Sequence, residues 1–188
     1  MISGLLKPEA GTLLSRGRPI TEADLHIGYM LQRDHLFEWR TIYSNVLLGL
    51  EISRTLTPER KEKVGEMMET YGLKSFSNAR PSELSGGMRQ RAALIRTLAM
   101  EPDLLLLDEP FSALDAHLRD KLMIEMRDVL AKFGREVIMV THSRDEAYNM
   151  SREIAVMDGG KLLIKNKTKA LFADPGSVPA AILTGCKN

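Results

Sequence analysis

The 188-residue chain is long enough to fold around one hydrophobic core, and its 44% hydrophobic and 27% charged residues are ordinary for a globular protein. Its 26 basic and 25 acidic residues leave a net charge of +1, which argues against nucleic acid as the main partner. No apolar run approaches the roughly 18–20 residues of a membrane span, the N-terminus does not resemble a signal peptide, and the single cysteine, Cys186, cannot build a disulfide framework. We therefore expect a cytosolic chain that reaches a membrane only through a partner.

The N-terminal part of the chain predicts two strands followed by a helical region. Residues 11–15 and 27–31 are short strand candidates bounded by turn residues. Residues 41–83 predict a small helical insertion rich in methionine and leucine. Within it, Thr57-Pro58 is typical of a helix start and Gly72 of a helix end.

The C-terminal part alternates between helices and strands. Ser85-Gly86-Gly87 predicts a helix start, and Asp115 precedes a long amphipathic helix that ends at Gly134. Apolar runs over residues 104–107 and 137–141 predict strands buried on both faces, as in a parallel sheet. Two further short strands flank Asp158-Gly159-Gly160 and predict a hairpin, at residues 154–157 and 162–164. This alternation predicts an α/β fold with a mainly parallel sheet.

Polar side chains follow three of the predicted strands. Gln32, Asp108-Glu109 and His142 each stand where a strand ends, and in an open parallel sheet these ends converge on one edge, where ligands bind. Asp108 could hold a hydrated Mg²⁺ and Glu109 could polarise an attacking water. From the residues alone, two solvated carboxylates at a strand end, a surface histidine and a solvated glutamine remain alternatives.

The string from Leu84 to Arg91 reads Leu-Ser-Gly-Gly-Met-Arg-Gln-Arg. Two glycines at a helix N-terminus allow backbone amides to approach an anion closely, and the helix dipole adds a partial positive charge there. An ordinary serine N-cap with turn glycines is the alternative for Ser85-Gly86-Gly87, although it does not account for all eight residues.

The order of these motifs resembles the ABC ATPase family over almost the whole chain. Gln32 matches the Q-loop, Leu84 to Arg91 the signature motif, residues 104–109 Walker B, Ser112 to Asp115 the D-loop, and His142 the switch histidine. The resemblance implies a RecA-like P-loop NTPase core with a mainly parallel sheet and an ABC helical subdomain. It implies three segments: a core remnant with the Q-loop at residues 1–38, the helical subdomain at 39–83, and the remainder of the core, beginning with the signature helix, at 84–188.

The resemblance also implies roles for these residues in a head-to-tail dimer that binds ATP and Mg²⁺. Glu109 would act as catalytic base, Gln32 and His142 would sense the γ-phosphate, and Asp108 with Gln32 would bind Mg²⁺. Four further residues would contact the nucleotide of the opposite subunit: Ser85, Gly86, Gly87 and Gln90. Asp115 would link the two nucleotide sites.

One family motif is absent from the sequence, because no G-x-x-x-x-G-K-[ST] string occurs in it. The first residues resemble the helix that follows this motif, so we expect Met1 to be an internal methionine, with the phosphate loop and the first strands upstream. We therefore expect no useful ATP affinity for these 188 residues alone, which a fluorescent-ATP titration would test, and an exposed apolar sheet surface prone to aggregation. Paired with a full-length subunit, the chain could still complete one composite site.

An importer is indicated by the segment around Leu36 to Thr41, which resembles the Q-loop region that receives a permease's coupling helix; ordinary packing of Trp39 is the alternative. The part up to about Leu118 is most similar to nitrate, sulfonate and taurine importers, and the end to molybdate-type importers, although Ser143 replaces a common aspartate. These features favour uptake of an oxyanion such as molybdate, with an extracytoplasmic solute-binding protein as indirect partner, at the cytoplasmic face of the membrane. A non-catalytic regulatory subunit and a soluble ABC ATPase are the rival interpretations.

Overall fold

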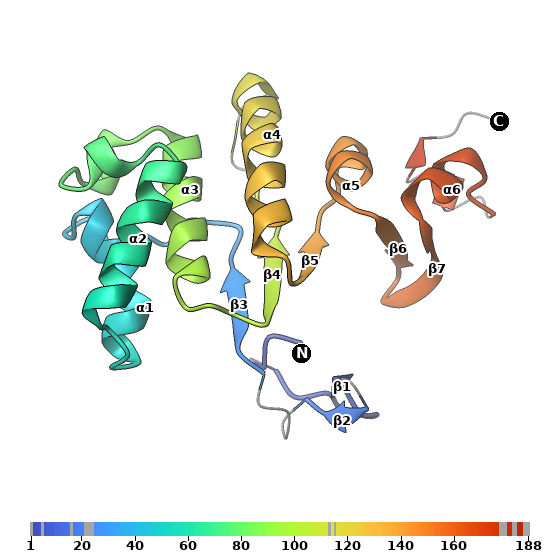
Figure 1. Cartoon of the computed structure of the whole chain (residues 1–188). Coiled ribbons are helices and arrows are strands. Elements are labelled where there is room, and N and C mark those ends of the chain that lie inside the picture. Colours follow the sequence, from blue (N-terminus) through green and yellow to red (C-terminus); the bar gives the residue numbers. More distant parts are fainter. Residues whose placement is uncertain are drawn as a thin grey trace.

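The computed structural model describes residues 2–4, 6–15, 17–20, 25–112, 114, 116–176, 180–181 and 184–185. Its centre is a three-stranded parallel sheet in the order β3 (Ile27–Met30), β4 (Leu104–Asp108), β5 (Glu136–Val140). Leu104 pairs with Ile27 on one side and with Glu136 on the other. Because the strands are parallel, their carboxyl ends lie at one edge, as the predicted α/β class requires (Figure 1).

Six α-helices and two 3₁₀-helices are present among the described residues. The predicted starts are confirmed, because the side chains of Thr57 and Ser85 accept hydrogen bonds from the backbone amides of Arg60 and Met88. The helices are α1 (Ile42–Ile52), α2 (Pro58–Thr70), η1 (Lys74–Phe76), η2 (Pro81–Glu83), α3 (Gly86–Leu98), α4 (Ala116–Phe133), α5 (Arg144–Met150) and α6 (Thr168–Ala173). None of those in the described part of the chain is long and apolar enough to cross a membrane.

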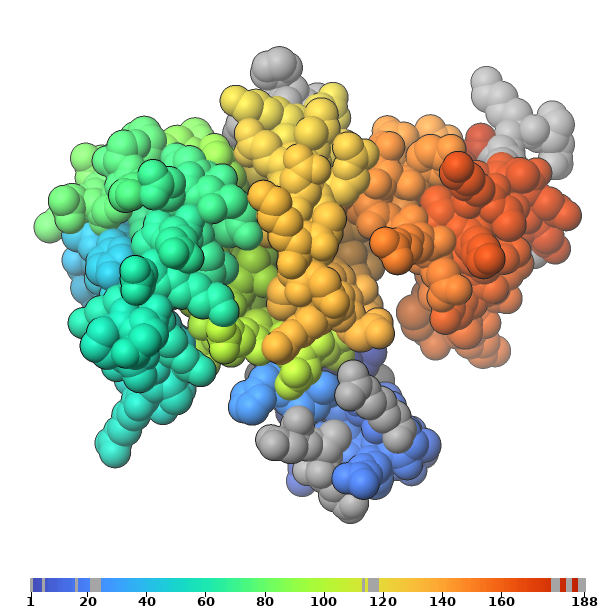
Figure 2. Space-filling model, viewed as in Figure 1, coloured from blue at the N-terminus to red at the C-terminus, as the bar shows by residue number. Residues whose placement is uncertain are grey.

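Helix α3 contributes residues to two hydrophobic clusters. Leu94 and Leu98 belong to a cluster with residues of β4 and α4, whereas Ile95 belongs to a second cluster with α1 and α2. In Figure 1, α1, α2 and α3 accordingly form one group beside the sheet, and α4 runs roughly along the direction of β4, in front of it. Figure 2 shows α4 as a ridge between this group and the C-terminal part of the chain. A displacement of α3 therefore acts on both clusters.

Strand β3 approaches α3 closely because Gly28 has no side chain. A Cβ built at Gly28 would lie 2.8 Å from both Pro102 Cγ and Thr97 Cγ2. Thr97 is on α3 and Pro102 is in the turn between α3 and β4. The glycine thus fixes the distance between the helix and the strand that leads to Gln32.

One predicted feature of the sheet is wrong. The sequence predicted β5 to be buried on both faces, but only Val137 and Met139 pack against the core, while Ile138 and Val140 are 42% and 57% exposed. Helices α3 and α4 cover one face of the sheet, and within the described residues β5 pairs with β4 alone. Its apolar residues therefore alternate between core and solvent although the run itself is continuous.

Two antiparallel hairpins flank the parallel sheet. The strand predicted at residues 11–15 is reduced to β1 (Leu14–Ser15), which pairs with β2 (Arg18–Pro19). The predicted C-terminal hairpin is confirmed as β6 (Glu153–Asp158) and β7 (Lys161–Lys167). Gly159 and Gly160 have φ angles of 53° and 75°, which glycine adopts without steric cost.

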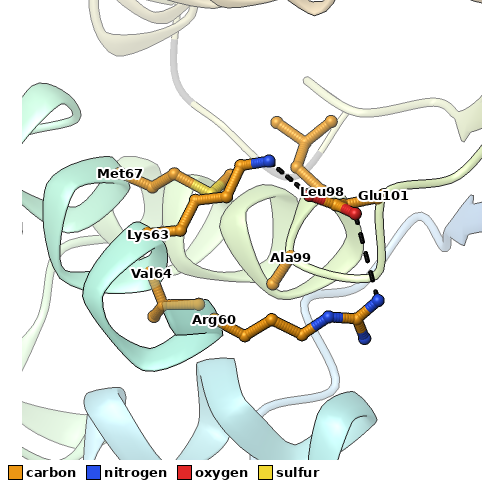
Figure 3. Close-up of a pocket in the computed structure, with 7 residues that line it drawn as sticks. All are labelled: Arg60, Lys63, Val64, Met67, Leu98, Ala99 and Glu101. Carbon is orange, nitrogen blue, oxygen red and sulfur yellow. Dashed lines mark hydrogen bonds and ion pairs between the residues drawn. The ribbon is translucent and has the colours of Figure 1, made fainter. Parts of the chain in front are cut away.

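A cluster of charges joins α2 to the turn after α3. Figure 3 shows Arg60 and Lys63 of α2 reaching Glu101 across a small pocket whose walls include Val64 and Leu98. The hydrogen bond from Lys63 and the positive charges around it lower the pKa of Glu101 below the usual value for glutamate. These contacts lie at the start of β4, at the opposite end of the strand from Asp108.

Candidate functional site

Glu109 lies at the centre of a polar cluster where the three parallel strands end. Its Oε2 accepts a hydrogen bond from Gln32 Nε2 at 3.1 Å, and its Oε1 lies 3.1 Å from His142 Nδ1. The cluster therefore joins residues that follow β3, β4 and β5. The predicted convergence of Gln32, Glu109 and His142 is confirmed.

The backbone at Glu109 directs its side chain into this cluster. Its φ angle is 45°, in the left-handed region that non-glycine residues rarely adopt and that costs about 1–3 kcal/mol. Its amide still donates to Val140 O at 2.9 Å. The pairing of β4 with β5 thus extends one residue further while the carboxylate turns towards the strand ends.

Ser112 is a member of the cluster that the sequence placed only in the D-loop string. Its Oγ accepts from Gln32 Nε2 at 3.2 Å and donates to Glu109 O at 2.9 Å. The backbone amide of Ser112 also donates to Glu109 O, at 3.1 Å. The three-residue spacing of a serine after a strand-ending acid was the only available signal for this turn.

Asp108 faces β3 as well as the strand ends. Its Oδ2 accepts from the hydroxyl of Tyr29 at 2.8 Å. Because ionisation of the phenol would remove this hydrogen bond and place a phenolate beside a carboxylate, the interaction raises the pKa of Tyr29 above its usual value. The sequence did not identify Tyr29, although the parallel register places it beside Leu106, one pleat repeat before Asp108.

The strand ends offer oxygen ligands suited to a hard cation. Gln32 donates through Nε2, so its Oε1 remains an acceptor, and Asp108 retains Oδ1 beyond its bond with Tyr29. The described residues contain no cluster of three or more His, Cys, Asp or Glu side chains able to hold a metal by themselves. This donor set fits Mg²⁺, which keeps several waters and binds through one or two protein groups together with phosphates.

The N-terminus of α3 presents the predicted anion-binding string. Ser85 is exposed, and its hydroxyl accepts from the amide of Met88 at 3.3 Å. Gly86 is partly exposed, and a Cβ there would lie 3.2 Å from Leu114 Cδ2, so the helix start packs closely on the segment after Ser112. Gly87 is buried. Asp115, the last residue of the predicted D-loop, lies outside the described residues.

Gln90 is buried in the molecule and contacts the loop that carries Gln32. Its side chain is 3% exposed, and its Nε2 donates to the backbone carbonyl of Gln32 at 3.2 Å. Gln90 is thereby brought to the strand-end cluster through the main chain of Gln32.

Comparisons with known proteins identify relatives over the whole chain. The profile of a family described as ABC transporter matches residues 1–112. An uncharacterized ABC transporter ATP-binding protein of Bacillus subtilis (strain 168), YtlC, is 47% identical over 154 residues, which cover 82% of this chain and 59% of YtlC. A probable sulfate/thiosulfate import ATP-binding protein of Chlorella vulgaris, CysA, is 36% identical over 100% of this chain and 80% of its own length.

A solved structure shares the fold. CbiO1 from Clostridium perfringens, described as part of the ABC transporter complex cbiONQ, aligns with a TM-score of 0.80 and 26% identity over 97% of this chain and 76% of that protein. Further relatives are named for import of Fe(3+) ions and transport of putrescine. The chain spans about half the length of several of these curated relatives, for example 54% and 51% of those two.

Proposed function

Since the chain belongs to the ABC transporter family of ATP-binding proteins, we propose that it is part of an importer's ATP-hydrolysing subunit. In this proposal Glu109 activates the attacking water. The observation that carries it is the position of Glu109 between Gln32 and His142, with one carboxylate oxygen directed towards each. A carboxylate held in this way can accept a proton from a water, which is worth roughly 10²–10⁴-fold in rate.

The neighbours of Glu109 support its orientation and the contact with substrate. Gln32 Nε2 donates to the carboxylate at 3.1 Å, and Ser112 Oγ holds the same Gln32 amide in place by accepting from it at 3.2 Å. The side chain of His142 is 75% exposed, so it can also donate to a ligand above the sheet edge. We assign to Gln32 and His142 the sensing of the γ-phosphate of ATP.

Asp108 and Gln32 are the proposed ligands of Mg²⁺. Bound with ATP, the ion would neutralise charge on the β- and γ-phosphate oxygens. Tyr29 orients the Asp108 carboxylate through its hydroxyl, which leaves the second oxygen of that carboxylate for the ion. Replacing Asp108 by asparagine should therefore raise the Mg²⁺ concentration needed for hydrolysis, while the affinity for metal-free ATP changes less.

The start of α3 would serve a second subunit. Ser85 and Gly86 are accessible at a helix N-terminus, where amide groups and the helix dipole favour a phosphate. We propose that Ser85, Gly86 and Gly87 contact the nucleotide of the opposite subunit in a dimer, and that Asp115 links the two sites. The 188 residues contain no G-x-x-x-x-G-K-[ST] string, so this proposal assigns the phosphate cradle to residues outside them.

A second candidate function uses the start of α3 but not the Glu109 cluster. The chain would then only complete the composite site of a partner subunit, or bind the permease, without hydrolysing ATP at its own Glu109. The accessibility of Ser85 at the start of α3 supports this alternative. Under it, Ser85 acts in the dimer whereas Glu109 does not.

Mixing experiments separate the two candidates. The chain is co-expressed with a family member that carries the phosphate-binding string but whose own signature serine is changed to arginine, and hydrolysis of ATP is measured. Rescue by this chain that disappears with Ser85→Arg but persists with Glu109→Gln supports the composite-site role. If Ser85→Arg leaves the rescue intact, α3 does not serve a second subunit.

A membrane permease is the proposed partner, at the cytoplasmic face of the membrane. Trp39 is 73% exposed, and its ring lies against that of Phe37 with centroids 4.7 Å apart and planes tilted by 46°, in the segment between the Gln32 loop and α1. Tryptophan is enriched among the residues that anchor protein interfaces. The exposure therefore supports the coupling-helix interpretation of this segment.

The transported solute is proposed to be an oxyanion such as molybdate. The support is the resemblance of the C-terminal part to molybdate-type importers, and the name of CysA, which concerns another oxyanion pair, sulfate and thiosulfate. Relatives named for Fe(3+) ions and putrescine represent the competing cationic solutes. Uptake of radiolabelled molybdate, sulfate, Fe³⁺ and putrescine is compared between a deletion strain and its parent. The deletion should abolish uptake of the transported solute and leave uptake of the other three unchanged.

A further inference from the structure

Helix α3 binds the main chain of the loop that carries Gln32 at three positions. Gln90 Nε2 donates to the carbonyl of Gln32 at 3.2 Å. The guanidinium of Arg96 donates to Asp34 O at 2.7 Å and to His35 O at 2.8 Å. These bonds connect one helix to the main chain of residues 32–35, which we call the Gln32 loop.

Burial makes this attachment stiff. Gln90 is 3% exposed, and its Oε1 has no hydrogen-bond partner in the described part of the protein, so the bond to Gln32 is the main polar contact of its amide. Burial lowers the pKa of Arg96, and the nearby charge of Asp34 opposes that effect. Breaking a bond of this kind leaves a buried polar group unsatisfied, which is unfavourable. His35 has a φ angle of 45°, a strained conformation that needs such surrounding contacts.

The attachment links the two ends of the proposed site. Ser85 caps the start of α3, and Gln90 lies little more than one turn further along the same helix. The backbone of Gln32 is held by Gln90, while its side chain donates to Glu109. A movement of the α3 start therefore reaches the Glu109 carboxylate through a single residue.

We propose that Gln90 and Arg96 are positioning residues that join α3 and the Gln32 loop into one rigid unit, so that Gln32 follows α3 relative to Glu109. This inference rests on the proposed function. The sequence placed Gln90 among the nucleotide contacts, whereas here it acts through Gln32 from inside the subunit. When a nucleotide engages Ser85, the same displacement of α3 changes the contact between Gln32 and Glu109.

Hydrogen–deuterium exchange on the full protein tests the rigid unit without any need for hydrolysis. The amide of Leu36, immediately after the Gln32 loop, donates to Asp34 Oδ1 at 3.1 Å and reports on the loop. Gln90→Met keeps the size of the side chain but removes the donor. Arg96→Met removes the bonds to Asp34 O and His35 O, and the bond from Arg89 Nε to the Asp34 side chain remains in both variants. Both should accelerate exchange in residues 33–36 by roughly tenfold, with the exchange of α3 retained.

Arg91→Met is the matched control. Arg91 is also an arginine of α3 that donates to a backbone carbonyl, but its acceptor is Tyr71 O, at 2.9 Å, away from the Gln32 loop. It should leave exchange in residues 33–36 unchanged. If Gln90→Met and Arg96→Met accelerate this exchange no more than Arg91→Met does, the rigid unit does not exist.

A double-mutant cycle on ATP hydrolysis, measured on the protein as the cell produces it, separates positioning from a general structural role. Gln90→Met should lower kcat roughly tenfold, since misplacement of a catalytic group is costly, with little change in the KM for ATP. In a Gln32→Ala background the carbonyl that Gln90 binds is still present, so a structural defect would persist. The positioning role predicts instead that Gln90→Met causes no further loss there, and additive losses would overturn it.

Failure of the proposed function has a different signature. If Glu109→Gln leaves hydrolysis unchanged, the catalytic assignment is wrong, whatever the exchange experiment gives. If Glu109→Gln abolishes hydrolysis while Gln90→Met affects neither kcat nor exchange, only the positioning inference is overturned.

Discussion

Replacing Gly28 by alanine tests whether β3 and α3 are as close as their packing requires. The added methyl group would lie 2.8 Å from both Thr97 Cγ2 and Pro102 Cγ. Carbon atoms pack at about 3.5–4.0 Å, so strand and helix must separate by close to 1 Å. Overpacking of this kind costs about 1–3 kcal/mol, and the reduced entropy of the unfolded chain returns only about 0.4–1 kcal/mol.

The net loss expected for Gly28→Ala is therefore roughly 1–2 kcal/mol, which lowers the Tm by about 2–8 °C for a domain of this size. Gly65 provides the matched control, because it lies within α2 and a Cβ there meets nothing within 4 Å. Gly65→Ala should raise stability by roughly 0.5–1 kcal/mol. Urea unfolding followed by circular dichroism measures both variants.

Opposite signs for the two glycine variants would support the close approach of β3 to α3. Gly28→Ala should also lower ATP hydrolysis, because β3 leads directly to Gln32. A Gly28→Ala protein as stable as the unmodified protein would refute the packing described here, since three contacts at or below 3.0 Å cannot be accommodated without displacement.

Three further perturbations follow from individual contacts. Because the pKa of Tyr29 is raised in the folded protein, its bond to Asp108 stabilises the fold below the unfolded-state pKa of 10.0, and this stability is lost as pH rises through the folded-state pKa. The urea midpoint of the unmodified protein should therefore fall more steeply above pH 10 than that of Tyr29→Phe. Parallel curves for the two proteins would contradict this. The lowered pKa of Glu101 means that its ion pairs contribute above pH 4.5 and are lost as pH falls through the folded pKa; in Glu101→Gln, part of the acid sensitivity of unfolding and its salt dependence should disappear, at a cost of about 0–1 kcal/mol at neutral pH. Trp39→Ala should leave the Tm and basal hydrolysis within error but reduce solute uptake and co-purification of the permease, and normal uptake would remove Trp39 from the interface.

The sequence predicted the centre of the candidate site because the carboxyl ends of adjacent parallel strands lie side by side at one edge of the sheet. Once residues 27–31, 104–107 and 137–141 are taken as parallel strands, Gln32, Glu109 and His142 must end at one sheet edge. Their mutual contacts at about 3.1 Å agree with this reasoning. The helix start at Ser85 was equally accessible, because capping depends on residues close in sequence.

Features that depend on tertiary pairing were not predictable in this way. Tyr29 reaches Asp108 across the β3–β4 register, over 79 positions of sequence. Arg96 binds a loop 61 and 62 positions earlier, and nothing in its local sequence indicates that acceptor. The exposure of Ile138 depends on which face of β5 is covered, which the apolar run over residues 137–141 does not encode. The role assigned to Asp115 stays a prediction.

The proposed function depends most directly on the proton-accepting role of Glu109. In the protein as the cell produces it, Glu109→Gln retains the size of the side chain and an oxygen able to accept from Gln32, but it removes the carboxylate. Single-turnover hydrolysis of ATP should fall by roughly 10²–10⁴-fold while the affinity for ATP is retained. A Glu109→Gln protein that hydrolyses ATP at the unmodified rate would contradict the account.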